Sequence, residues 1–253
     1  MSAIAVSCVV FACVFSGALL GMFLQGPLPD QHLSNESKDV VKLGTGLIAT
    51  LAALVLGLLI ASAKTAYDTQ NNEIKQMSAS ILLLDRVLAH YGPETKEARG
   101  LLRRTVAGAV DRIWPENSSR PANLAPLKNR AEAESFFDKI QDLQPQNDVQ
   151  RSLHAQALQI STDLGKTRFL LFEQRGSSFA TPFLLVLVFW LTIIFATFGL
   201  FAPHNATVIA MLFACALSVS GAIFLILELD QPFEGLVQIS SAPMRDALSR
   251  LGE

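Results

Sequence analysis

The sequence predicts an all-α membrane protein with four transmembrane helices and a cytoplasmic helical bundle formed by long helices continuous with spans 2 and 3. Four uncharged apolar runs, each about 20 residues long, predict the spans. Hydrophobic residues make up 51% of the chain and charged residues only 17%, against about 25% in typical soluble domains. Apolar residues at helical spacing on both sides of the central polar region predict the bundle.

The four apolar runs are residues 3–24, 43–63, 179–201 and 208–227. At about 1.5 Å of rise per residue, each is long enough to cross a hydrocarbon core of about 30 Å. No Lys or Arg precedes the first run, which is also longer than the apolar region of a signal peptide, about 7–15 residues. We therefore expect this run to be a transmembrane span and not a signal peptide.

The basic residues predict the orientation of the spans. Four spans place the N-terminus, the central segment and the C-terminal tail on one side of the membrane. Of the 20 Lys and Arg residues, all but Lys38 and Lys42 lie on that side, so the positive-inside rule makes it cytoplasmic. The chain thus divides into spans 1 and 2 (residues 1–63), a cytoplasmic helical domain (64–178), spans 3 and 4 (179–228) and a cytoplasmic C-terminal tail (229–253).

Long helices are expected to link the spans to the cytoplasmic domain. Ile74, Met77, Ile81, Leu84, Leu88 and Tyr91 are three or four residues apart, and no Pro or Gly occurs between Lys64 and Gly92. This seam predicts one helix over about 41–90, and a similar seam with no proline between residues 149 and 181 predicts a second helix running into span 3. Shorter helices are expected at 94–114 and 130–143, separated by a proline-rich loop.

Motifs for catalysis are missing from the sequence. The four histidines are scattered, and the sequence has no HExxH, GxGxxG, Walker or GxSxG pattern. The three cysteines lie in spans without metal-ligand spacing. Basic and acidic residues alternate in the cytoplasmic part, which does not favour nucleic-acid binding. We expect no enzyme activity, no cofactor, no metal and no nucleic acid.

The second span carries a stripe of small residues with a lysine at each end. The stripe is Lys42, Gly46, Thr50, Ala53, Gly57, Ala61 and Lys64. Small residues at this spacing let another helix approach closely. Alternatively the stripe lines a pore, where Thr50 and small side chains leave room and rings of lysine favour anions.

The fourth span ends in two carboxylates, Glu228 and Asp230, just before Pro232. Both meet the negative end of the helix dipole at the membrane boundary, so a compensating cation is expected from Lys64, Arg168 or Arg175. One reading is an interfacial ion-pair cluster. The others are a cation site or gating element, solvent exposure, and a pair of metal ligands in a membrane enzyme.

The segment ELDQPFEG, which contains Asp230, Pro232, Phe233 and Gly235, resembles the segment after the last transmembrane helix of bestrophins. Together with VQIS and the order of spans, it resembles the bestrophin-like family of bacterial membrane proteins. The resemblance implies a pentameric anion channel in the bacterial inner membrane, with the second span lining the pore and Glu228 and Asp230 near the gate. Glu234 is followed by Gly-Leu-Val where animal bestrophins carry an acidic calcium clasp, so no calcium gating is expected.

We therefore expect a homo-oligomeric ion channel in the lipid bilayer that conducts small inorganic anions. The alternative is a non-conducting membrane scaffold or sensor that relays signals through its cytoplasmic helices.

Overall fold

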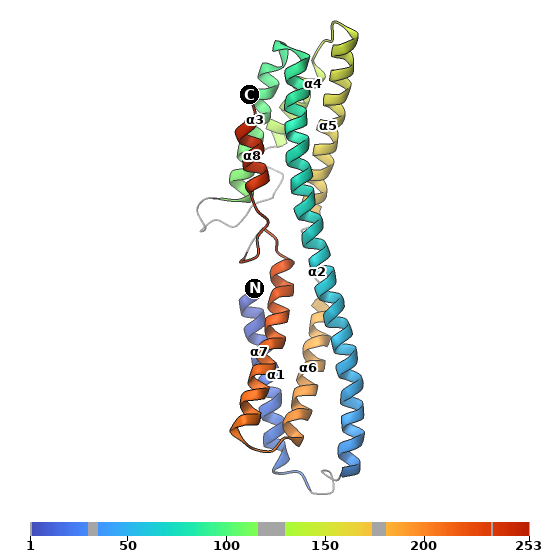
Figure 1. Ribbon diagram of the computed structural model, residues 1–253, viewed down its shortest axis with the longest axis vertical. Coiled ribbons are helices and arrows are strands. Elements are labelled where there is room, and N and C mark those ends of the chain that lie inside the picture. Colours follow the sequence, from blue (N-terminus) through green and yellow to red (C-terminus); the bar gives the residue numbers. More distant parts are fainter. Residues whose placement is uncertain (1, 30–34, 116–129, 174–180, 234, 253) are drawn as a thin grey trace. The chain divides into compact units, whose positions relative to one another are not determined.

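The computed structural model describes residues 2–29, 35–115, 130–173, 181–233 and 235–252; within these, only the backbone is described at 130–134, 172–173 and 181. Every regular element among the described residues is a helix (Figure 1). The chain forms two compact units. One, here called the four-span unit, comprises residues 1–66 and 178–231. The other, the helical unit, comprises residues 67–177 and 232–253.

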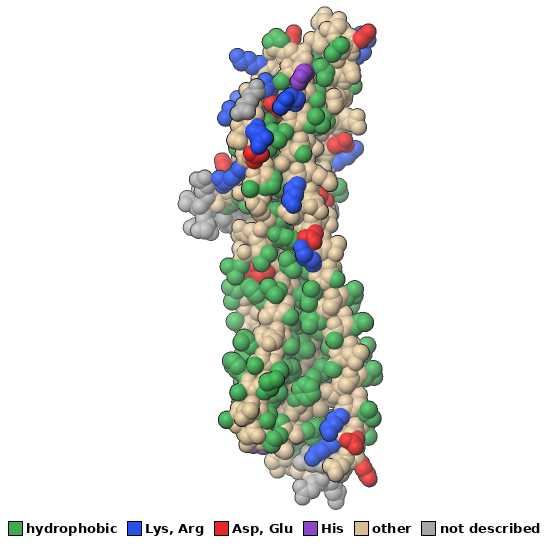
Figure 2. Space-filling view, in the orientation of Figure 1, with side chains coloured by type: hydrophobic (Ala, Val, Ile, Leu, Met, Phe, Trp, Pro, Cys, Tyr) green, Lys and Arg blue, Asp and Glu red, His purple; other side chains and the backbone are tan. Residues whose placement is uncertain are grey.

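The four-span unit contains α1 (Ala3–Gln25), the first part of α2 (Asn35–Tyr91), α6 (Thr181–Phe201) and α7 (Ala206–Leu229). All four are long and apolar enough to cross a membrane, which confirms the four predicted spans and makes this a membrane protein. Figure 2 shows a nearly continuous hydrophobic surface over this unit, interrupted by charged side chains at the start of α2. Such a surface is stable only against lipid or another protein.

Polar caps begin two of these helices. The Ser2 hydroxyl accepts a hydrogen bond from the Ala5 backbone N–H of α1 at 3.3 Å. The Asn205 side chain accepts one from the Val208 N–H of α7 at 2.8 Å. Each cap satisfies a backbone donor that the helix itself leaves unpaired. The caps therefore fix where the apolar helices start.

Glycines set the packing of α1 against α6. A Cβ on Gly21 would overlap the Ala196 carbonyl, and one on Gly199 would overlap the Ala18 carbonyl. At Gly17 a Cβ would lie 2.9 Å from the Thr192 methyl group. Gly17 and Gly21 form a GxxxG pattern, which lets two membrane helices bring their backbones together. The two helices are thus held by close backbone contact rather than by large side chains.

The second helix runs unbroken for 57 residues, which confirms the predicted long helix over about 41–90. Within the helical unit its predicted seam forms the core. Ile74, Ile81, Leu84, Leu88 and Tyr91 are all at most 4% exposed. A helix of this length follows from the absence of Pro and Gly after Gly57, since these are the residues that most often end one.

The rest of the helical unit packs on this seam. It contains the short 3₁₀ helix η2 (Pro93–Thr95), α3 (Lys96–Ile113), α4 (Arg130–Gln141), α5 (Asp148–Glu173) and α8 (Ala242–Arg250). Gly92 makes the turn out of α2 with a φ of 138°, a value that favours glycine. The buried Thr95 hydroxyl donates to the Leu88 carbonyl at 2.6 Å and secures that turn.

The C-terminal segment packs into the same unit and is more ordered than the tail predicted from the sequence. The Trp114 indole N–H donates to the Ile239 carbonyl at 2.8 Å, and its ring meets Phe233 edge-on with centroids 6.1 Å apart. Met244 of α8 and Leu251 after it are buried. The helix α8 was not predicted, because its nine residues alternate charged and apolar side chains over little more than two turns.

Two predictions fall on residues outside those described. Helix α5 ends at Glu173 and α6 begins at Thr181, so the expected continuity into span 3 would lie within residues 174–180. The proline-rich loop between the two short helices lies largely within residues 116–129. The three cysteines, by contrast, are described and are free thiols.

Candidate pore-lining surface

Helix α2 has three distinct faces inside the four-span unit. The buried face contains Thr45, Ala52 and Ala63, with Ile48 and Leu56 packed on the core formed with the other spans. Because residues follow one another about 100° apart around a helix, the small-residue stripe is centred about 130° from this buried face. A face of leucines lies about 90° further round. The stripe and the leucines are therefore neighbouring faces, which adjoin at Leu43 and Ala61.

The small-residue stripe is exposed along its whole length. All its members are exposed: Lys42, Gly46, Thr50, Ala53, Gly57, Ala61 and Lys64. A Cβ added at Gly46 or Gly57 would meet no heavy atom within 4 Å. Among the described residues no helix of the same chain covers this stripe. The sequence also allowed this stripe to pack closely against another helix. Within the chain, the glycines that do so are Gly17, Gly21 and Gly199.

The leucine face is also exposed and is strongly apolar. Leu43 is 77% exposed, and Leu47, Leu54 and Leu58 are similarly open. Only 11% of the apolar part of α2 is buried within the chain, against 28% in each of the other spans. Helix α2 is thus the span that a single chain covers least.

The two lysines mark the ends of the stripe. They are 22 residues apart, a helical distance of about 33 Å, which matches a hydrocarbon core of about 30 Å. Lys42 lies 4.0 Å from the Asp39 carboxylate, and both side chains are mostly exposed, so this pair offsets little of the lysine charge. Lys64 is exposed and makes a polar contact of its own.

A groove of about 460 Å³ opens beside Lys42, between α2 and α6. Thr45, Gly46 and Ala49 form its α2 side, and Thr197 and Phe198 belong to its α6 side. The Thr50 hydroxyl, one turn further along, donates to the Gly46 carbonyl at 2.9 Å. The hydroxyl proton of Thr50 is therefore engaged in a hydrogen bond within the helix. The positive charge on this surface comes from the lysines.

The predicted acidic cluster is divided between the two units. Glu228, in the last turn of α7, is only 5% exposed, and Asp230 caps the same helix, so both belong to the four-span unit with Lys64. Arg168 belongs to α5 in the helical unit. Arg175 lies outside the described residues. Lys64, Arg168, Glu228 and Asp230 each make a polar contact, so none is an isolated charge.

No group of three or more potential metal ligands (His, Cys, Asp or Glu) occurs among the residues that the structure describes. Glu228 and Asp230 therefore have no third ligand of this kind beside them in the described part of the chain.

The profile of the bestrophin-like domain matches residues 12–244, which is most of the chain. This protein belongs to the bestrophin-like family. No curated protein and no solved structure matches the sequence. The family assignment confirms the resemblance that the Asp-x-Pro-Phe-x-Gly segment carries.

In this bestrophin-like chain the Pro-Phe segment joins α7 to the helical unit. Phe233 is 5% exposed and packs on Trp114, and the Pro232 carbonyl accepts a hydrogen bond from Ile239 N–H at 2.7 Å. Gly235 has a φ of 84°, which a side chain would strain. Pro232, Phe233 and Gly235 thus each have a structural role in placing the C-terminal segment.

Sequence reasoning missed two features of this family member. The Gly17–Gly21 pattern was readable, but a lysine-flanked stripe in span 2 is the more conspicuous small-residue pattern. Trp114 was read as the end of a helix, and no local signal links it to Ile239, 125 residues away. Only the fold brings these two together.

Proposed function

We propose that this bestrophin-like protein is an oligomeric ion channel that conducts small anions through a pore lined by α2. The observation that carries the proposal is the exposed small-residue stripe of α2, which is as long as a membrane is thick and has a lysine at each end. The channel lies in the bacterial inner membrane. Both termini are in the cytoplasm, as the positive-inside rule favours.

The three faces of α2 suit a ring of subunits around a central axis. The buried face attaches the helix to its own chain, and the leucine face is suited to lipid or to a neighbouring subunit. The remaining face carries Gly, Ala and Thr, which leave space when several copies of the helix face one axis. An assembly of this kind gives the uncovered stripe a role that a single chain does not provide.

The lysines support anion preference. In a ring each lysine is repeated by symmetry, so Lys42 and Lys64 become two rings of positive charge at the mouths. The family resemblance implies five subunits.

A matched pair of glycine variants tests the assignment of the pore face. Gly57→Leu places a leucine on the small-residue stripe, whereas Gly44→Leu places one toward the leucine face. At neither glycine would an added Cβ meet a described atom within 4 Å beyond the adjoining part of its own helix, so both variants fit the fold of the single chain. In proteoliposomes we expect Gly57→Leu to reduce chloride flux at least tenfold and Gly44→Leu to leave it within a factor of two.

Charge reversal tests selectivity separately. The Lys42→Glu/Lys64→Glu double variant is expected to shift the reversal potential of planar-bilayer currents toward cations. Lys75→Glu, an exposed lysine on α2 in the helical unit, is the control and is expected to leave the reversal potential unchanged. Because the control reverses one lysine and the double variant two, a shift in Lys75→Glu about half as large as in the double variant would show that overall charge, and not a pore lining, sets the preference.

The alternative is a non-conducting scaffold or sensor, and the unbroken 57-residue α2, which passes through both units, favours it. Reconstituted protein without any ion flux, together with cryo-EM views in which another helix fills the stripe, would decide for this alternative. A central opening lined by α2 together with anion flux would decide for the channel.

A further inference from the structure

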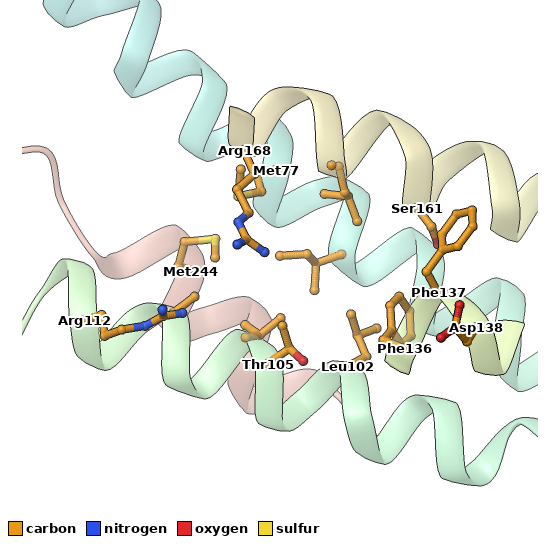
Figure 3. A pocket seen from close by; sticks show the side chains of 15 residues that line it. Met77, Leu102, Thr105, Arg112, Phe136, Phe137, Asp138, Ser161, Arg168 and Met244 are labelled. Atoms are coloured by element: carbon orange, nitrogen blue, oxygen red, sulfur yellow. The ribbon is translucent and has the colours of Figure 1, made fainter. Parts of the chain in front are cut away.

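A cavity of about 360 Å³ lies inside the helical unit, between α2, α3, α4, α5 and α8 (Figure 3). This volume is within the range of small-molecule sites, about 300–1,000 Å³. The greater part of its wall is apolar and includes Met77, Leu102, Val106, Phe136 and Met244. The cavity lies wholly in the helical unit and is separate from the proposed pore surface.

Two arginines border one end of this cavity. Arg112 comes from α3 and Arg168 from α5, and in Figure 3 the Arg168 guanidinium extends from α5 toward α3. The Arg112 Nε–H donates to the Gly108 carbonyl at 2.8 Å, and no carboxylate of the described residues forms an ion pair with Arg112. Its remaining N–H groups therefore carry a positive charge that the described part of the chain does not neutralise.

The two guanidinium groups repel each other. Burial lowers the pKa of Arg168, and the nearby positive charge of Arg112 lowers it further. Two like charges at the edge of an apolar space repel each other whatever other contact Arg168 makes, and a bound anion would offset that repulsion. Paired arginines are also the side chains best suited to holding a carboxylate through two parallel hydrogen bonds.

Other groups at the cavity wall define which ligand fits. Asp138 and Phe137 lie at the end opposite the arginines (Figure 3), so an anionic group is attracted to one end and repelled from the other. Thr105, on α3 between these ends, has a buried hydroxyl oxygen that finds no hydrogen-bond partner among the described residues. A second polar group is thus available close to the apolar wall.

We propose that this cavity binds a small amphipathic anion, a medium-chain carboxylate, with its head at Arg112 and Arg168 and its apolar tail along the α2–α3–α4 wall. Charge complementarity at one end selects the head, and the apolar wall selects the tail. A simple inorganic anion would bind less well because it leaves the apolar wall in contact with water. An amphipathic cation would bind less well because the arginines repel it. The carboxylate comes from the aqueous phase, because the described residues of the helical unit contribute no apolar run of membrane-spanning length.

The test uses full-length protein in lipid nanodiscs and isothermal titration calorimetry. Octanoate is the probe, octyltrimethylammonium carries the same tail with the opposite charge, and acetate carries the head without the tail. Empty nanodiscs correct for partition into lipid. We expect saturable binding of octanoate at one site per chain and at least tenfold weaker binding of the other two compounds.

Variants locate the site. Arg112→Gln and Arg168→Gln are each expected to weaken octanoate binding about tenfold or more, since each removes charge-assisted hydrogen bonds. Arg151→Gln, at an exposed arginine of α5 that pairs with Asp148, is the matched control and is expected to change nothing. Gly165→Phe places a ring in the cavity, where an added Cβ meets open space, and is expected to abolish binding while keeping both arginines.

Circular dichroism melting curves show whether each variant is folded. If an arginine variant does not fold, Gly165→Phe locates the binding site in its place. Three results would overturn the proposal: no saturable octanoate binding, equal binding of octyltrimethylammonium, or unchanged octanoate affinity in the folded cavity variants. Channel activity plays no part in this test, so failure of the binding site and failure of the proposed conduction are distinguishable.

Discussion

Arg99 of α3 holds the Asp85 carboxylate of α2 at both oxygens, with Nε 2.8 Å from Oδ1 and Nη2 2.8 Å from Oδ2. The Asp85 side chain is 9% exposed and that of Arg99 22%, so the pair is largely shielded from water. The Gly252 N–H lies 3.4 Å from the same carboxylate and ties the C-terminus to it. Three separate segments of the helical unit therefore meet at one acidic side chain.

Replacing Asp85 tests this junction. Asp85→Asn removes the charge that Arg99 needs, and we expect the free energy of unfolding to fall by about 1.5–3 kcal/mol. Glu97→Gln is the control, because its pair with Lys139 is exposed and contributes less than about 1 kcal/mol. Thermal melts in detergent measure both variants. Equal effects would mean that the Asp85–Arg99 pair is no stronger than a surface ion pair.

The attachment of the C-terminal segment depends on Trp114. Trp114→Phe keeps an aromatic ring against Phe233 but leaves the Ile239 carbonyl without its indole donor, a cost of about 1–3 kcal/mol. We expect faster proteolytic cleavage within residues 232–253. Mass spectrometry of the fragments measures the cleavage rate. Arg250→Ala, which removes only an exposed pair with Asp246, should leave the cleavage rate unchanged.

The contact between α1 and α6 depends on the absence of side chains. Gly21→Ala forces a methyl group onto the Ala196 carbonyl, so we expect the helices to separate at a cost of about 1–3 kcal/mol. Gly221→Ala on α7 is the matched control, because an added Cβ there meets no atom within 4 Å. Melting temperatures in the same detergent compare them. A Gly21 variant as stable as the control would contradict close backbone packing.

Tyr91 makes the stability of the protein sensitive to alkaline pH. Burial, and then the nearby Glu94 charge, raise the pKa of Tyr91 above its usual value of about 10. As pH rises above 10 the unfolded chain ionises first, so the free energy of unfolding falls until the pKa of the folded protein is passed. Tyr91→Phe should remove this part of the loss between pH 9 and 11, measured by urea unfolding.

At pH 8 the same variant should be at least as stable as the parent, because the Tyr91 hydroxyl is buried without a hydrogen-bond partner. Tyr67→Phe provides the contrast, since the Tyr67 hydroxyl donates to the Gln238 carbonyl at 3.3 Å and its loss should lower stability already at pH 8. A Tyr91 variant that behaved like the Tyr67 variant would point to a missing partner for Tyr91.

Local patterns accounted for most of the elements. The four spans and the long α2 follow from uncharged apolar runs and from helical spacing, both of which act within a few turns of one helix. The boundaries of α3 and α4 were close for the same reason. Helix α8 escaped prediction because two turns of mixed residues have little preference of their own and become helical through burial of Met244 and Ala247.

The candidate sites could not be predicted from local sequence patterns alone. Two sets of small residues at helical spacing, Gly17–Gly21 in α1 and Gly46–Gly57 in α2, have equal capacity for close packing in the sequence. Only the first meets a complementary glycine, Gly199, 178 residues further along the chain than Gly21. The arginines of the cavity likewise come from helices that have no sequence relation to each other.

The sequence by itself therefore determined that this chain is a helical membrane protein of the bestrophin-like family, because hydropathy, helical period and the Pro-Phe motif are properties of contiguous residues. Only the tertiary structure decided that the described residues of the chain leave the α2 stripe uncovered and that Arg112 and Arg168 border one cavity. The physical reason is that burial and charge proximity depend on which distant segment packs against a face.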